Sequence, residues 1–283
     1  MPTFKSAFRP GVFTRLRCKH LTLVILGICF GLSTHAFASC PAGADPTRWI
    51  NGGKYCLAIR QAGQTEVGKA RKMVILVHGD VSKGDPADYM YIPADSFGND
   101  ETIAVALIRP GYEDSKRHKS QGSNNNYRDN YTATNIDAMA DAIRLLKKRY
   151  GVRRTIVMGH SGGAAITGVM LGKHPGIADG AVLVSCPCNI PEWRKLRRKQ
   201  GKNLWQHSLS PHTFVDRVPV TSRVIAITGD SDDNTLRSFG ASYVETLQKR
   251  GVNATFLNVK GGRHSFKSLW PAVKDATTKL LAN

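Results

Sequence analysis

The stretch Thr155-Ile156-Val157-Met158-Gly159-His160-Ser161-Gly162-Gly163-Ala164-Ala165 decides the fold. A short β-branched apolar run meets a Gly-x-Ser-x-Gly turn, and small residues with helical propensity follow at once. This order is typical of a nucleophile elbow, a sharp strand-to-helix turn that presents a serine hydroxyl above a sheet. Glycines suit positions 159 and 163 because a Cβ there would collide with the neighbouring strand and helix. The stretch predicts Ser161 as a nucleophile, and the alternative is a glycine-rich turn with a solvated serine.

Apolar runs and segments with helical spacing alternate on both sides of this turn. Uninterrupted apolar runs are typical of strands buried on both faces of a parallel sheet. The alternation therefore predicts an α/β fold, a mostly parallel sheet with helices on both faces. We expect strands at residues 54–60, 73–77, 103–108, 181–185, 224–228 and 254–259, and helices at 131–150, from the serine turn to about 173, at 235–250 and up to about 281.

Polar residues follow several of these predicted strands, at the edge of the sheet where ligands bind. They are His78, which precedes Gly79, then Ser161, an acidic cluster at 230–233, and His264. A serine hydroxyl becomes a good nucleophile when a histidine takes its proton and a carboxylate orients that histidine. His264 is the best candidate base, because it lies just past a strand and at the head of a helix. Asp230, Asp232 and Asp233 compete for the role of the acid.

The chain resembles the α/β hydrolases, and within them the branch of dienelactone hydrolase and prolyl-oligopeptidase-like enzymes. The similarity lies in the elbow, in His78-Gly79, and in a C-terminal signature at residues 229–235, 243–247, 251–252 and 261–266. In that branch the acid comes three residues after the glycine, which falls on Asp232, with Asp233 as the runner-up. We expect Asp233 to cap the helix that begins near Thr235, and Asp230 to serve the turn.

The same resemblance implies an oxyanion hole made by the backbone N–H groups of Gly162 and Asp80. Asp80 departs from the family pattern, because a carboxylate beside a forming oxyanion would oppose catalysis unless it turned away. The resemblance implies a serine hydrolase that needs no cofactor and no metal, with a small-molecule or polymer-linked ester as substrate and an amide as the alternative. A carboxylesterase is favoured over a peptidase, since the sequence shows no propeller domain. The rival hypothesis is a non-catalytic binding protein on a hydrolase scaffold.

Two segments interrupt the alternation of strands and helices. Residues 113–130 are polar, basic and rich in asparagine, and such a long loop is usually functional or mobile. Residues 186–218 contain three prolines, two tryptophans and a basic run, and we expect a small cap inserted after the preceding strand.

The first 38 residues have the pattern of a signal peptide. Five basic and no acidic residues precede or flank an apolar run at 21–32, and Ala36-Phe37-Ala38 is a small-x-small cleavage site. We expect a mature hydrolase domain at 39–283 that is periplasmic or secreted, and an uncleaved anchor is the lesser alternative.

Four cysteines remain after this cleavage, and export permits disulfides. Cys40 and Cys56 are expected to join the N-terminal arm to the first strand. Cys186 and Cys188 could close on each other, pair elsewhere or stay free, and their sequence does not decide among these.

The predicted mature chain is strongly basic. The whole chain has 40 basic and 21 acidic residues, and the loss of five basic residues with the leader leaves a formal charge of +14. This charge favours contact with an anionic surface, such as a membrane or an acidic polymer, although solubility alone would also explain it. The basic residues form no aromatic-interleaved motif, so a nucleic-acid partner is not expected. The sequence does not indicate an oligomeric state.

Overall fold

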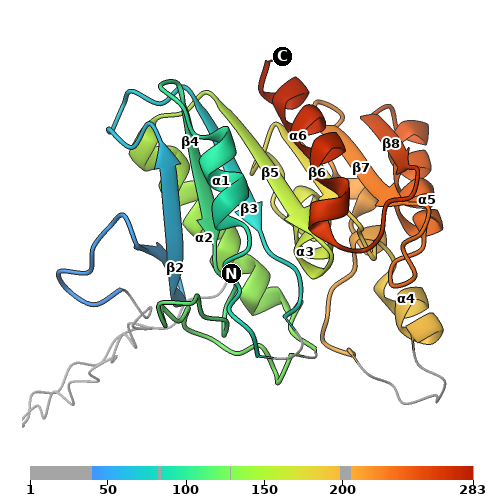
Figure 1. The fold of residues 1–283 in the computed structure, drawn as a ribbon, viewed down its shortest axis with the longest axis horizontal. Coiled ribbons are helices and arrows are strands. Elements are labelled where there is room, and N and C mark those ends of the chain that lie inside the picture. The colour runs from blue at the N-terminus through green and yellow to red at the C-terminus, as the bar shows by residue number, and fades with distance from the viewer. Residues whose placement is uncertain (1–39, 82–83, 128, 198–204, 283) are drawn as a thin grey trace, which may run out of the picture. The chain divides into compact units, whose positions relative to one another are not determined.

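The structure is a computed structural model that describes residues 40–81, 84–127, 129–197 and 205–282. Eight strands form one sheet in the order β1-β2-β4-β3-β5-β6-β7-β8 (Figure 1). Strands β4 to β8 and β3 run parallel, whereas β2 is antiparallel to both of its neighbours. The strands are β1 (Trp49–Gly52), β2 (Tyr55–Gly63), β3 (Lys72–Val77), β4 (Thr102–Leu107), β5 (Arg154–His160), β6 (Gly180–Val184), β7 (Arg223–Gly229) and β8 (Asn253–Val259).

Helices cover both faces of this sheet, as the alternation predicts. One face carries α1 and α6, and the opposite face carries α2, α3 and α5 (Figure 1). The helices are α1 (Tyr91–Phe97), α2 (Ala133–Tyr150), α3 (Gly162–Lys173), α4 (Ile190–Arg197), α5 (Arg237–Lys249) and α6 (Phe266–Ala282). The predicted fold, an α/β-hydrolase sheet with two helical layers, is confirmed.

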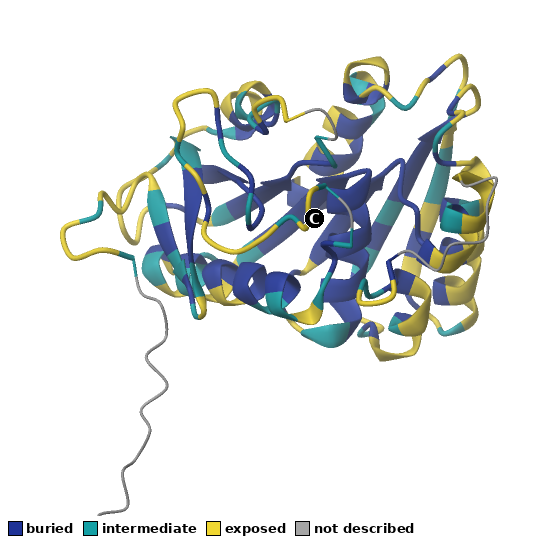
Figure 2. Cartoon of the chain, turned by 90° about the horizontal axis from the view of Figure 1, so that it is seen from below, coloured by how far each residue is buried: buried dark blue, intermediate teal, exposed yellow. Residues whose placement is uncertain are grey.

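Strand β3 shows how an unbroken apolar run supplies both cores. Met73, Ile75 and Val77 pack on the side of α2 and α3, whereas Val74 and Leu76 pack on the side of α1 and α6. Successive strand side chains point to opposite faces, so every apolar residue of the run is buried. Figure 2 shows the central strands as a continuous buried layer between partly exposed helices.

The N-terminal arm is more regular than the sequence suggests. Residues 49–52 form β1, which pairs with β2 in a hairpin, whereas the sequence indicates only an arm before 54. The predicted disulfide between Cys40 and Cys56 is present and ties the start of the arm to β2. The predicted signal peptide lies outside the described residues.

The cap predicted at 186–218 falls in the segment between β6 and β7. Its described residues form α4 and two short 3₁₀ turns at Pro211–Thr213 and Val215–Arg217. Those turns pack closely on α3, where a Cβ on Gly172 would lie 2.1 Å from the Phe214 carbonyl oxygen. Cys186 and Cys188, left open by the sequence, are bonded to each other. No helix in the described part of the chain has the length and apolar character needed to span a membrane.

Candidate active site

The turn between β5 and α3 has the geometry of a nucleophile elbow. Ser161 has φ +53° and ψ −120°, a conformation that a non-glycine residue rarely adopts. A Cβ on Gly159 would lie 2.4 Å from the Gly163 carbonyl oxygen, and a Cβ on Gly163 would lie 2.3 Å from the Val77 carbonyl oxygen. Both glycines are therefore required by close backbone approach, as the sequence predicts.

His264 connects this serine to a carboxylate. Its Nε2 lies 3.0 Å from Ser161 Oγ, and its Nδ1 lies 3.0 Å from both carboxylate oxygens of Asp232. A carboxylate can only accept, so Nδ1 carries the proton and Nε2 is free to accept from the serine hydroxyl. The structure thus brings together the three side chains that the sequence singles out, from the loops after β5, β7 and β8.

Asp232 is held in place by its own loop as well as by His264. Its Oδ1 accepts the amide N–H groups of Asn234 and Thr235, at 3.0 and 2.8 Å. Burial alone would raise the pKa of Asp232, but the hydrogen bonds from His264 and from the Thr235 amide hold it below its ordinary value. The carboxyl group is therefore ionised at neutral pH, which favours the oriented tautomer of His264.

The two neighbouring acids have other places. Asp230 Oδ1 accepts the Gly261 amide N–H at 2.8 Å, so this side chain ties the turn after β7 to the loop that carries His264. The predicted cap by Asp233 is wrong: α5 begins at Arg237, and the residue before it makes no side-chain cap. The free amides of this turn bond to Asp232 instead.

His160 supports the His264 loop from behind. Its Nε2 lies 2.9 Å from the His264 carbonyl oxygen, and its Nδ1 lies 2.8 Å from the Tyr89 hydroxyl, which accepts the Gly79 amide N–H at 2.5 Å. A carbonyl only accepts, so Nε2 is protonated and Nδ1 accepts from Tyr89. Burial, together with the nearby His264, lowers the pKa of His160 to about 4, so this ring is neutral at physiological pH.

The loop after β3 lies directly against the serine. A Cβ on Gly79 would be 3.0 Å from Ser161 Cβ, which places the Gly79–Asp80 backbone beside the nucleophile. Neither the Asp80 nor the Gly162 amide N–H has an acceptor among the described residues, so both can donate to a ligand. His78 is fully buried and bonds to the Gly79 carbonyl and the Arg109 amide, so it joins the loops after β3 and β4.

Three further residues belong to this region and were not identified from the sequence. Tyr89 bonds to His160, and both Arg109 and Tyr131 bond to the Asp80 carboxylate. Arg109 follows β4 at the same edge of the sheet as Ser161, which is a usable signal. Tyr89 comes from a loop whose course the sequence does not predict. Tyr131 was expected to begin the helix at 131–150, but α2 begins at Ala133 and Tyr131 lies just before it.

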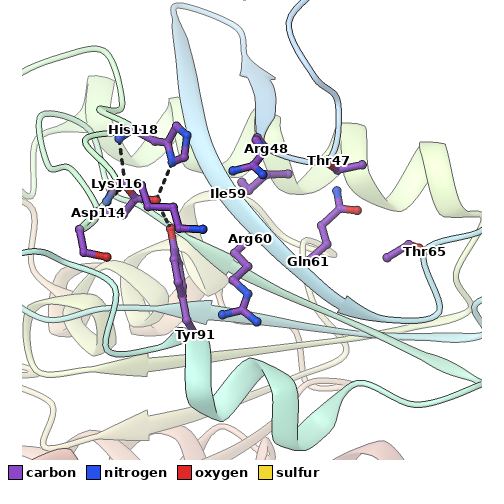
Figure 3. Close-up of a pocket in the computed structure, with 11 residues that line it drawn as sticks. Thr47, Arg48, Ile59, Arg60, Gln61, Thr65, Tyr91, Asp114, Lys116 and His118 are labelled. Atoms are coloured by element: carbon purple, nitrogen blue, oxygen red, sulfur yellow. Dashed lines mark hydrogen bonds and ion pairs between the residues drawn. The ribbon is translucent and has the colours of Figure 1, made fainter.

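Two pockets that Ser161, Asp232 and His264 do not line matter here, and the first of them shares Tyr89 and His160 with this region. An apolar pocket of about 610 Å³ lies between the first turns of α1 and α6, and it is lined by residues that include Tyr89, Phe266 and Trp270. A second pocket, of about 620 Å³, lies along β2 and the loop at 114–118 (Figure 3). Its lining does not include Ser161, Asp232 or His264.

The fold agrees with the comparisons to known proteins. No curated protein has a matching sequence. Among solved structures, Est1E from Butyrivibrio proteoclasticus with bound ferulic acid is 17% identical with a TM-score of 0.63, and covers 83% of this chain and 99% of its own. The Pyrococcus furiosus esterase Pf2001 is 15% identical with a TM-score of 0.62, covering 83% and 90%. A Klebsiella pneumoniae protein described as a dienelactone hydrolase is 13% identical with a TM-score of 0.57, covering 80% and 92%.

The profile of the prolyl oligopeptidase family matches residues 116–280, more than half of the chain. That match includes the elbow at Ser161, the acidic cluster and His264. The resemblance noted in the sequence is confirmed. The chain belongs to the prolyl oligopeptidase family, and it is a serine hydrolase of the α/β-hydrolase superfamily.

Proposed function

We propose that the protein is an exported esterase that forms an acyl-enzyme on Ser161. The observation that carries this proposal is the line of hydrogen bonds from Ser161 Oγ through His264 to Asp232. It supplies a nucleophile, a base that can take its proton, and an acid that fixes the tautomer of the base. The esterases among the solved structures of the same fold favour an ester over an amide substrate.

In the proposed first step, Ser161 Oγ attacks the ester carbonyl carbon while its proton passes to His264 Nε2. The carbonyl oxygen becomes an oxyanion, and the amide N–H groups of Gly162 and Asp80 donate to it. The imidazolium is stabilised by Asp232 and gives its proton to the departing alkoxide. This leaves an ester between the acyl group and Ser161.

The second step repeats this chemistry with water. His264 Nε2 takes a proton from a water molecule, whose oxygen attacks the acyl carbonyl carbon. The second tetrahedral intermediate uses the same two amide donors. Its collapse returns the proton to Ser161 Oγ and releases a carboxylic acid.

A panel of nitrophenyl esters with acyl chains of increasing length tests this function. The wild-type protein should hydrolyse at least one of them with a burst equal to the enzyme concentration. Ser161→Ala should retain the fold by circular dichroism and lose turnover. Equal hydrolysis by both proteins would refute an acyl-enzyme on this serine.

Export is the second part of the proposal. It is supported by the basic and apolar leader with its small-x-small site at residues 36–38, and by the two disulfides. Disulfides persist in oxidising compartments, which fits a periplasmic or secreted protein.

We also propose that the mature protein contacts an anionic surface or polymer. This contact could accompany ester hydrolysis, and in the rival hypothesis of a non-catalytic binding protein it would be the whole function. The pocket along β2 favours such contact, because Arg48, Arg60 and Lys116 surround it from three separate segments (Figure 3). Its one lining carboxylate, Asp114, is 4% exposed and already accepts from Tyr91, His118 and two amides. The oxygens of Asp114 are therefore already occupied within the protein, and the three cations of the lining outnumber this one carboxylate.

Retention on an anionic polysaccharide column tests this contact. The double variant Arg48→Ala/Lys116→Ala should elute at lower salt than Arg144→Ala/Lys249→Ala. The control removes the same number of positive charges, from ion pairs on α2 and α5. The arginine side chains are equally accessible in the two variants, since Arg48 is 52% exposed and Arg144 is 50% exposed. Identical elution of the two double variants would show that net charge alone holds the protein on the column.

A further inference from the structure

The Asp80 side chain is bound from two sides by groups that the chemical steps above do not use. Its Oδ1 accepts from Arg109 Nη1 at 2.9 Å, and its Oδ2 accepts from the Tyr131 hydroxyl at 2.6 Å. The Arg109 side chain is 1% exposed, and that of Asp80 is 16% exposed. This ion pair is therefore mostly withdrawn from water, where its interaction is stronger than at a surface.

The Asp80–Arg109 ion pair lies beside Gly162, the residue that follows the proposed nucleophile. A Cβ on Gly162 would lie 2.5 Å from Asp80 Oδ1 and 2.3 Å from the Tyr131 hydroxyl oxygen. The carboxylate and the phenol thus occupy the space where the side chain of any other residue at 162 would stand. A formal negative charge is held close to the site where the proposed mechanism forms a second one.

An uncompensated carboxylate at this position would raise the energy of the oxyanion. Arg109 supplies the compensating charge, and it is itself fixed by the His78 carbonyl, by the Asn130 side-chain oxygen and by the faces of Tyr112 and Tyr131. The guanidinium centre lies 5.0 and 5.4 Å from those two ring centres, so the cation is held on several sides.

We propose that Arg109 and Tyr131 are positioning residues for the reaction, acting through Asp80. They fix the Asp80 carboxylate in one orientation against Gly162 and neutralise it, so that the Asp80 amide N–H can serve as an oxyanion donor. This proposal rests on the proposed acyl-enzyme mechanism. It accounts for a carboxylate at a position where one would otherwise oppose catalysis.

A charge-rescue experiment separates this role from a structural one. Arg109→Met leaves the carboxylate unpaired, and we expect kcat on a nitrophenyl ester to fall about 100-fold with KM little changed, a loss like that of one oxyanion donor. The double variant Asp80→Asn/Arg109→Met has neither charge, and its kcat should be at least about tenfold higher than that of Arg109→Met. Affinity for an alkyl boronic acid, which forms an anionic adduct with the serine, should follow kcat across the set.

Arg144→Met is the matched control, since Arg144 also pairs with an aspartate, Asp141, but far from the site on α2. Its kcat should equal that of the wild type. If Arg109→Met does not fold, Tyr131→Phe provides the second test, because it removes one hydrogen bond and no charge. We expect it to lower kcat about tenfold and to weaken boronate binding by a similar factor.

The outcomes distinguish this proposal from the function on which it rests. A wild-type protein that neither turns over esters nor binds the boronate would remove the proposed function itself. An active wild type with unchanged kcat in Arg109→Met, or a double variant no better than the single one, would overturn the positioning role alone. Unchanged kcat and boronate affinity in a folded Tyr131→Phe protein would overturn the part played by Tyr131.

Discussion

Asp232 presents both carboxylate oxygens to Nδ1 of His264 at 3.0 Å, and its Oδ1 also accepts two amides of its own loop. The same atom thus fixes the turn after β7 and the tautomer of the histidine. Of the three acids in the cluster, Asp232 alone contacts His264 among the described residues. Its side chain is fully buried, whereas that of His264 is partly exposed toward the site.

Substitution of Asp232 by asparagine should nearly abolish turnover in a folded protein. Asparagine offers an amide group that can leave His264 in the wrong tautomer, a change worth up to about 10⁴ in turnover in a serine protease. The measurement is kcat on a nitrophenyl ester, with the melting temperature recorded for each variant.

Asp230→Asn and Asp233→Asn are the controls for that experiment. Asp230→Asn should lower the melting temperature more than kcat, because Asp230 holds the Gly261 amide. Asp233→Asn should alter neither, since Asp233 is exposed and caps no helix. A normal rate in Asp232→Asn together with an inactive Asp233→Asn would show that the acid is wrongly assigned.

Stability should decrease as the pH is lowered from about 6.5 to about 4, in part because of His160. The unfolded chain takes up a proton near the ordinary histidine pKa of 6.5, whereas in the folded protein burial keeps the ring neutral down to about 4. The unfolded state therefore binds more protons in this window, which lowers the free energy of unfolding by at most about 1.4 kcal/mol per pH unit.

The variant His160→Gln isolates this contribution, because a glutamine side chain does not titrate but can still donate and accept hydrogen bonds. Its denaturation midpoint should depend less on pH between 4 and 6.5 than that of the wild type. His78 is also buried with a lowered pKa, so a residual slope is expected. Parallel curves for the two proteins would exclude a neutral, buried His160.

The disulfide between Cys40 and Cys56 should contribute measurably to stability. Its cysteines are 16 residues apart, and closing a loop of this size is worth about 3 kcal/mol in the chain-entropy model. Urea denaturation of Cys40→Ser/Cys56→Ser, with the Cys186–Cys188 bond intact, should show a loss of that order. An unchanged midpoint would mean that β1 and β2 hold the arm without the bond.

The mature protein should begin at Ser39. The basic leader, the apolar run and the Ala36-Phe37-Ala38 site predict cleavage after Ala38. N-terminal sequencing of the protein recovered from the periplasm or medium measures this directly. A form that begins at Met1 in that fraction would contradict the prediction.

Much of the fold could be predicted because its signals are local. The apolar run at 73–77 forms a strand because both faces of the sheet bury it. The glycine spacing around Ser161 forms the sharp turn because backbone atoms approach each other closely there. The arm at 49–52 was not predicted as a strand, because its partner β2 supplies the pairing and its own pattern is short.

The candidate site divides in the same way. Ser161, Asp232 and His264 follow strands in a recognisable order, so the sequence identifies them. The partners of Asp80 could not be identified, because Arg109 and Tyr131 lie 29 and 51 residues away, and only the fold brings them to Gly162. Asp233 was misassigned as a cap because the helix begins later, at Arg237, and Asp232 takes up the free amides.

Covalent labelling of the intact protein by a fluorophosphonate tests the central claim most directly. Such a probe reacts with a serine only when a base activates it, and the adduct is measured by mass spectrometry and located by peptide mapping. We predict one adduct per wild-type chain, on Ser161, none in Ser161→Ala and greatly slowed labelling in His264→Ala. A wild-type chain that stays unlabelled, or an adduct that persists in Ser161→Ala, would contradict the account.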